Sequence, residues 1–158
     1  MKLIVIAVCL FLMGCNNLEQ VTFIQETDGT ATTLSTEERP PSLSFKIGET
    51  VIKTDKGTYS WRFFDGKSKQ MVTTLADHAA PTQMVNIEDG VKLDVNEPIS
   101  VTFTTMPNSY EIRVWDEQAL LSIYETFGDI KQRGNYIIEI VGYWDAGSAT
   151  YVAAVEIL

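Results

Sequence analysis

Cysteine and histidine are scarce in this chain of 158 residues, and their positions exclude several kinds of chemistry. Both cysteines, Cys9 and Cys15, lie near the N-terminus, and no cysteine follows them. The rest of the chain therefore holds no disulfide, no thiolate metal site and no cysteine nucleophile. His78 is the one histidine, so the histidine pair of a catalytic zinc site is missing. We expect neither a metal nor a cofactor.

Positive charge is also in short supply. The chain has 12 Lys and Arg residues against 21 Asp and Glu residues, which gives a formal net charge of −9. Nucleic acids and anionic lipid surfaces are bound through clustered Lys and Arg. The composition therefore excludes a nucleic-acid partner, and any attachment to a membrane must come from something other than charge.

Long apolar runs are missing too. The longest, residues 3–13, has eleven residues, whereas a transmembrane helix needs about 20. Lys2 precedes this run and Gly14 follows it, which is the basic start, apolar centre and small residue at the cleavage site of a secretory signal peptide. The alternative is a buried N-terminal strand or helix, which would not explain the polar stretch that begins at Asn16.

Leu12-Met13-Gly14-Cys15 resembles the lipobox of bacterial lipoproteins. The resemblance implies that diacylglycerol is attached to the Cys15 thiol and that residues 1–14 are removed. Met13 departs from the small or β-branched residue that is usual at its position. Two acyl chains hold a protein stably on a bilayer, because each buried CH₂ contributes about 0.8 kcal/mol. We therefore expect the protein on the extracytoplasmic face of the cell membrane, anchored through lipid on Cys15.

Residues 15–42 are typical of a tether. Residues 27–36 are mostly small and polar, and Pro40 and Pro41 favour an extended chain. A flexible spacer of about 25 residues would reach roughly 25–30 Å from the bilayer. The alternative is that part of this segment forms an edge strand on the folded domain.

From Leu43 onward the sequence alternates between apolar and polar residues, as half-buried antiparallel strands do. Short turn sequences such as Asp65-Gly66 and Asp145-Ala146-Gly147 separate the alternating segments. The pattern predicts an all-β antiparallel β-sandwich over residues 43–158. Strands are expected near residues 43–47, 50–54, 58–64, 91–95, 98–105, 110–115, 119–124, 135–144 and 149–157. Residues 116–127 also fit a short helix capped by Asp116, but we favour a strand.

Gly134-Asn135-Tyr136-Ile137-Ile138 resembles the start of strand F in immunoglobulin-like domains. There a corner tyrosine bonds back to the backbone, and the position two residues later faces the core. Here that position is Ile138 instead of cysteine, so the inter-sheet disulfide of antibody domains is absent. Residues 136–144 and 151–157, joined across Asp145-Ala146-Gly147, are expected to form the F–G hairpin.

A wider resemblance covers most of residues 40–157. It is carried by Pro40-Pro41-Ser42-Leu43, Gly57-Thr58-Tyr59-Ser60-Trp61, Ala76-Asp77-His78-Ala79-Ala80-Pro81, Ile99-Ser100-Val101-Thr102-Phe103 and the hairpin at residues 134–151. The region is similar to an uncharacterised extracytoplasmic domain found in small lipoproteins of Bacillus-like bacteria and beside some membrane sensor peptidases. This resemblance implies a Gram-positive surface location and no particular activity.

Catalytic motifs are absent from the sequence. His78 has only Asp77 beside it, and adjacent residues on an extended chain point apart, so we interpret it as a loop residue. Gly147-Ser148-Ala149 lacks the upstream glycine of a nucleophile elbow. Asp116, Glu117 and Asp145 are candidates for a glycosidase carboxylate pair, but their separation is unknown. Glu88, Asp89, Asp94 and Asn96 are candidate calcium ligands in an order that does not match an EF-hand.

The aromatic residues are the better candidates for a binding surface, namely Trp61, Trp115 and Tyr143. Trp115 follows Val114 in a strand whose core face is expected at residues 110, 112 and 114, so it is expected to point outward. Tyr143 and Trp144 must face opposite sides of a regular strand. The alternative is that Trp115 ends its strand, or that the tether or residues 65–90 cover it.

The leading hypothesis is a lipid-anchored, non-catalytic module that binds or senses an extracellular protein or glycan. The alternatives are a carboxylate-dependent enzyme acting on cell-wall glycans, and an inhibitor or accessory subunit of a membrane peptidase. The inhibitor hypothesis requires a protruding extended loop, for which residues 65–90 are the candidate.

Overall fold

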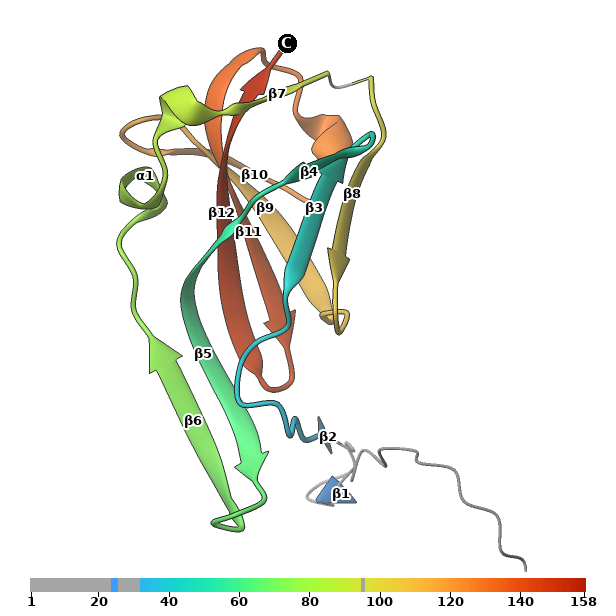
Figure 1. Cartoon of the computed structure of the whole chain (residues 1–158), viewed down its shortest axis with the longest axis vertical. Helices are drawn as coiled ribbons and strands as arrows, with labels where there is room; N and C mark the ends of the chain where they lie inside the picture. The colour runs from blue at the N-terminus through green and yellow to red at the C-terminus, as the bar shows by residue number, and fades with distance from the viewer. Residues whose placement is uncertain (1–23, 26–31, 95) are drawn as a thin grey trace, which may run out of the picture.

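The computed structural model describes residues 24–25, 32–94 and 96–158, and strands dominate it (Figure 1). The predicted signal peptide, residues 1–14, and the predicted lipidation site Cys15 lie outside the described residues. The strands are β1 (Ile24–Gln25), β2 (Thr32–Thr33), β3 (Leu43–Ile47), β4 (Thr50–Ile52), β5 (Asp55–Asp65), β6 (Gln70–Ala76), β7 (Val91–Leu93), β8 (Ile99–Phe103), β9 (Ser109–Trp115), β10 (Leu120–Tyr124), β11 (Gly134–Trp144) and β12 (Gly147–Ile157). The short helices are α1 (Pro81–Met84), η1 (Ile87–Asp89) and η2 (Phe127–Asp129).

Two sheets pack against each other, which confirms the predicted all-β sandwich. The large sheet has the strand order β10-β9-β11-β12-β5-β6, and β7 joins it by pairing in parallel with β12. The small sheet has the order β4-β3-β8 and lies over one face of the large sheet (Figure 1). No helix in the described part of the chain is long and apolar enough to cross a membrane.

The main core lies between the two sheets, and a smaller buried cluster of Ile87, Ile137 and Val152 lies on the opposite face of the large sheet. Phe45 and Ile47 of the small sheet and Ile112, Ile138 and Tyr151 of the large sheet are fully buried in the main core. Burying one such side chain stabilises the fold by roughly 1.5–3 kcal/mol relative to leaving it in water. The alternation read from the sequence thus defines the face of each strand that points inward.

The β11–β12 hairpin is the longest ladder of the molecule, and it confirms the hairpin predicted across Asp145-Ala146-Gly147. Its register runs without interruption from Gly134 opposite Ile157 to Trp144 opposite Gly147. Gly147 has a φ of +146°, and a Cβ there would lie 1.9 Å from the Ser60 carbonyl oxygen, so only glycine fits. The predicted corner contact is also present, since the Tyr136 hydroxyl donates to the Arg133 carbonyl at 3.1 Å.

The order of the strands matches an immunoglobulin domain in one sheet and departs from it in the other. Strand β11 lies between β12 and β9, as strand F lies between G and C. In an immunoglobulin domain strands D and E follow C in the chain and lie in the opposite sheet. Here β3, β4 and β8 form the small sheet and all precede β9, while β10 and η2 follow it.

Two uncertain segments of the sequence are resolved by the structure. Residues 120–124 form strand β10, so the favoured strand in residues 116–127 is confirmed. The expectation of one extended loop over residues 65–90 is wrong, because β6 pairs with β5 along its whole length and α1 and η1 follow it. The peptidase-inhibitor hypothesis therefore has no long extended loop at this place.

The segment before β3 lies against the sandwich, although we predicted it as the end of a tether. We refer to residues 35–41 as the strap. The Ser35 carbonyl accepts from the Phe64 backbone N–H, the Glu37 carbonyl from Trp61 Nε1 and the Pro40 carbonyl from Lys56 Nζ, at 2.8–2.9 Å. The strap thus runs antiparallel to β5, and residues from Ser35 onward bond to the domain, before the predicted boundary at residue 43.

Candidate binding surface

The face of the large sheet that points away from the small sheet carries a polar cluster. Because side chains alternate along a strand, Glu111, Arg113 and Trp115 project from β9 opposite to the core residues Ile112 and Val114. Strand β11 pairs with β9 so that Glu139 lies opposite Arg113. The register therefore gathers residues that are far apart in the sequence on one outer face.

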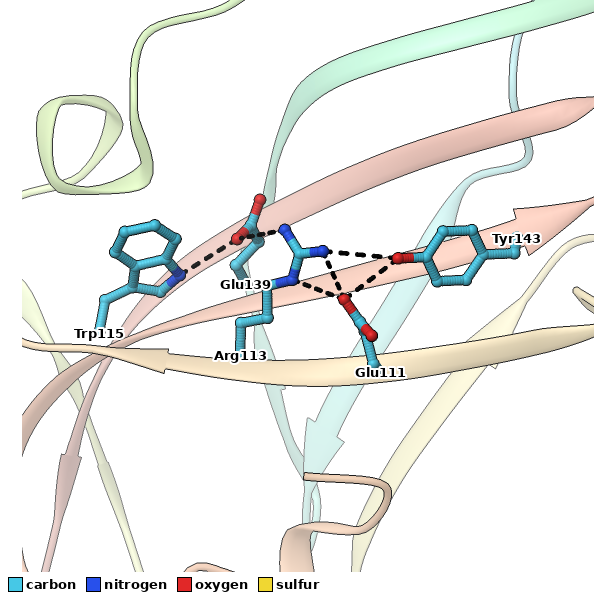
Figure 2. Close-up of polar contacts among 5 residues, drawn as sticks. All are labelled: Glu111, Arg113, Trp115, Glu139 and Tyr143. Atoms are coloured by element: carbon cyan, nitrogen blue, oxygen red, sulfur yellow. Dashed lines mark hydrogen bonds and ion pairs between the residues drawn. The ribbon is translucent and has the colours of Figure 1, made fainter. Parts of the chain in front are cut away.

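Arg113 is the centre of this cluster (Figure 2). Its Nη2 lies 2.5 Å from Glu111 Oε1, and its Nη1 lies 3.6 Å from Glu139 Oε2. At one end Trp115 Nε1 donates to Glu139 Oε2 at 3.1 Å. At the other end the Tyr143 hydroxyl donates to Glu111 Oε1 at 3.1 Å. One guanidinium thus links two carboxylates, each of which also holds an aromatic side chain.

Glu139 is the one buried charged residue among the described residues, with 5% of its surface exposed. Burial raises the pKa of its carboxyl, while the charge of Arg113 and the hydrogen bond from Trp115 act in the opposite direction. Burial also acts to lower the pKa of Arg113, but its bond to Glu111 and the charges of Glu139 and Glu111 outweigh this and raise it. Each charge therefore offsets part of the other's cost of leaving water.

The cluster is organised for holding side chains in place. Arg113 occupies the space between Glu111 and Glu139, so these two carboxylates do not face each other across an open site as the acid pair of a glycosidase does. The predicted carboxylates are engaged elsewhere. Asp116 accepts from the backbone N–H groups of Gln118 and Ala119 at 2.7 Å, which lowers its pKa, and Asp145 accepts from Asn108 at 2.6 Å.

Exposed apolar side chains border this cluster on the side of β10. Ile123 lies opposite Arg113 in the register and is 53% exposed, and Leu120 lies opposite Trp115 and is also exposed. Tyr143 is 37% exposed at the other end. The face therefore combines a polar centre whose charged groups are paired with one another and an apolar border. We refer to it as the Arg113 surface, formed by Glu111, Arg113, Trp115, Leu120, Ile123, Glu139 and Tyr143.

The structure brings together two of the three aromatic residues that the sequence suggested. Trp115 and Tyr143 belong to the Arg113 surface. Trp115 also ends strand β9 and is partly covered by residues 84–87, as the alternative interpretation of the sequence expected. Trp61 lies on the core side of the sheet and is only 3% exposed. Its ring packs edge-on against Trp144 at 5.6 Å, beside a groove of about 660 Å³ between the strap and residues 104–108. Trp61 therefore holds the strap by its bond to Glu37 and takes no part in the outer face.

The remaining candidates from the sequence lie apart from the Arg113 surface. His78 is exposed after β6, and its backbone N–H donates to the Thr58 hydroxyl at 3.1 Å. Asp94 accepts from both the backbone and the side chain of Asn96, which closes a turn. Within residues 24–25, 32–94 and 96–158, no group of three or more His, Cys, Asp or Glu residues is placed to hold a metal ion.

Sequence reasoning missed Glu111, Arg113 and Glu139 as parts of this surface. One signal was present, because Glu139 stands alone in the apolar run Ile137-Ile138-Glu139-Ile140-Val141. A carboxylate inside a strand buried on both faces requires a partner. That partner, Arg113, is identified only by the pairing of β9 with β11. No protein-family model, no curated protein and no solved structure matches this chain.

Proposed function

We propose that this protein is a lipid-anchored, extracytoplasmic and non-catalytic module that binds a protein partner through the Arg113 surface. The observation that carries the proposal is the pairing of exposed apolar side chains, Ile123 and Tyr143, with a charge network that is already satisfied within the sheet. Contact with a partner can bury the apolar border without separating the ion pairs. The surface thus offers apolar area at a low cost of desolvation.

The chemistry of the border favours a protein over a glycan. Sugars stack on flat, open aromatic rings, whereas Leu120 and Ile123 are aliphatic and Trp115 is half-buried. Tyr and Arg are enriched among the residues that dominate protein interfaces, and the neighbouring side chains serve to exclude water from them. The hydrogen bonds of Tyr143 and Trp115 hold both rings before binding, so little side-chain entropy is lost on contact.

Attachment to the membrane rests on the sequence. A basic start, an apolar run and Leu12-Met13-Gly14-Cys15 support lipidation at Cys15. Cys15→Ala should release the protein into the medium or leave it unprocessed, and membrane fractionation with mass spectrometry of the N-terminus measures this. Unchanged retention of the variant in the membrane would contradict the anchor without bearing on the Arg113 surface.

The binding proposal is tested by covalent cross-linking in intact membranes of cells that express the full-length chain. Ile123→Glu and Tyr143→Ala should each reduce the cross-linked partner about tenfold or more, because both residues supply apolar area at the surface. Val51→Glu is the matched control, since Val51 is 62% exposed on β4 of the small sheet. A partner that is lost equally from all three variants, or from none, would contradict the proposed surface.

A further inference from the structure

Strand β6 is an edge of the large sheet that lacks the usual protection against pairing with another strand. It pairs with β5 on one side, and no described strand pairs with its other side (Figure 1). Its seven residues, Gln70-Met71-Val72-Thr73-Thr74-Leu75-Ala76, include no charge, no proline and no glycine, and its register with β5 has no bulge. Soluble proteins usually shorten, charge or bulge such an edge, because its free backbone groups can extend a sheet.

The other edges of the two sheets are better protected. Strand β10 also exposes Leu120, Leu121 and Ile123, but its register shifts between Leu120 and Ser122, and β4 has only three residues. Strand β8 points Val101 and Phe103 toward the core and leaves the polar Ser100 and Thr102 exposed. On β6, by contrast, Leu75 is 72% exposed and Met71 is exposed beside it on the same face. The apolar side chains of β6 are thus available to a strand added at this edge.

We propose that β6 pairs antiparallel with β6 of a second copy of this chain, which joins the two large sheets across a twofold axis at Thr73. The axis at the middle of the strand aligns all seven residues. It places Thr73 opposite Thr73 of the second copy and Leu75 opposite Met71. Such cross-strand pairs of Thr with Thr and of apolar residues with each other are favourable.

Charge complementarity favours a second copy over other occupants of this edge. Lys69, in the turn just before β6, and Asp77, just after it, lie one residue beyond the two ends of the strand, so the same axis brings Lys69 near Asp77 of the second copy, twice by symmetry. Within the described residues neither Lys69 nor Asp77 has an ion-pair partner in its own chain. Repulsion between the two copies of Arg62 should be small. Arg62 lies opposite Thr73 on β5, so its two copies are three strand spacings apart, about 14 Å, which is beyond the screening length at physiological salt.

A disulfide trap tests the axis directly. Directly opposite residues of an antiparallel pair have Cα atoms about 4.5–5.5 Å apart, a separation that a disulfide spans. Thr73→Cys in the full-length chain should give a disulfide-linked dimer on mild oxidation in membranes. Thr102→Cys, exposed on β8, is the matched control and should not. The unaltered chain, oxidised in the same way, accounts for any dimer formed through Cys9 or Cys15.

A charge exchange tests the register without relying on a single variant. Lys69→Asp alone and Asp77→Lys alone should each raise the dissociation constant of the detergent-solubilised dimer about tenfold, because each creates two like-charged pairs. The double variant should restore the unaltered value, as measured by sedimentation equilibrium. Lys69 has a φ of +59°, which aspartate tolerates well, so Lys69→Asp should fold.

Each outcome decides the proposal. A dimer that is trapped through position 73 and rescued by the double exchange supports it. A chain that stays monomeric overturns it, even if another protein's strand pairs with β6. A dimer that is unaffected by both single exchanges, or that is trapped equally through position 102, also overturns it, because its interface would then lie elsewhere.

Discussion

The two faces of the large sheet use the same strands for different purposes. On β9, Ile112 and Val114 point into the core, while Glu111, Arg113 and Trp115 point outward. The inner face is apolar and packed against the small sheet, whereas the outer face combines a charge network and an exposed border with a small buried cluster around Ile137 and Val152. Substitutions at neighbouring positions of one strand should therefore have very different effects on stability and on binding. Four substitutions test this difference.

The largest effect is expected on the inner face. Ile112→Ala removes a fully buried side chain from the centre of β9, and the cavity that it leaves should lower the free energy of unfolding by about 2–5 kcal/mol. Urea denaturation followed by tryptophan fluorescence measures this. Binding at the Arg113 surface should survive in whatever fraction remains folded. A loss below about 0.5 kcal/mol would mean that the two sheets do not pack as described.

Arg113→Met is expected to be the most costly change on the outer face. It leaves the buried carboxylate of Glu139 without its cation, although water reaches the Arg113 side chain, which is 30% exposed. We expect a loss of about 1–3 kcal/mol, less than for a fully buried pair. The double variant Arg113→Met with Glu139→Gln should recover part of the loss. Equal stability of the single and double variants would show that the two charges are not coupled.

The stability of the fold should also depend on pH through Glu139. Its pKa in the folded state is raised above 4.5, so the folded state holds the proton more tightly than the unfolded state. The tighter proton binding therefore adds to the stability of the folded state. This contribution is fully present below pH 4.5 and is lost as the pH rises through the pKa of Glu139 in the folded state. Compared with Glu139→Gln, the unaltered protein should become relatively less stable across that range. Urea denaturation at a series of pH values tests this, and parallel curves for the two proteins would contradict it.

The smallest effect is expected for Tyr143→Phe. The change removes the hydrogen bond to Glu111 but keeps the ring, and the side chain is partly exposed, so we expect a loss of under about 1 kcal/mol. Binding should weaken less than in Tyr143→Ala. If Tyr143→Phe instead abolished binding, the hydroxyl group would have to contact the partner directly.

The sequence predicted the fold well wherever one face of a strand is buried. The alternation in residues 99–103 and 110–115 exists because core residues are selected to be apolar on one side only. Strand β6 was missed because its more exposed face carries the apolar Met71 and Leu75, while its less exposed face carries the polar Thr74, so apolar and polar residues do not alternate along it.

The Arg113 surface was predicted only in part, for a different reason. Side chains alternate along a strand, so the positions of Trp115 in β9 and of Tyr143 in β11 predict that both point outward. That Arg113 lies opposite Glu139 depends on the register between β9 and β11, which is set by pairing across the intervening residues 116–133. Local patterns identify which side chains leave the core, but they do not identify which ones meet.

The strap determines how the domain responds to a mechanical pull at its N-terminus. Its contacts follow one another along β5, from Ser35 with Phe64, through Glu37 with Trp61, to Pro40 with Lys56. A force applied from upstream would load these hydrogen bonds one at a time, in that order, before it reached β3. If these few contacts break before those of the two sheets, the strap would detach and lengthen the connection while both sheets kept their shape.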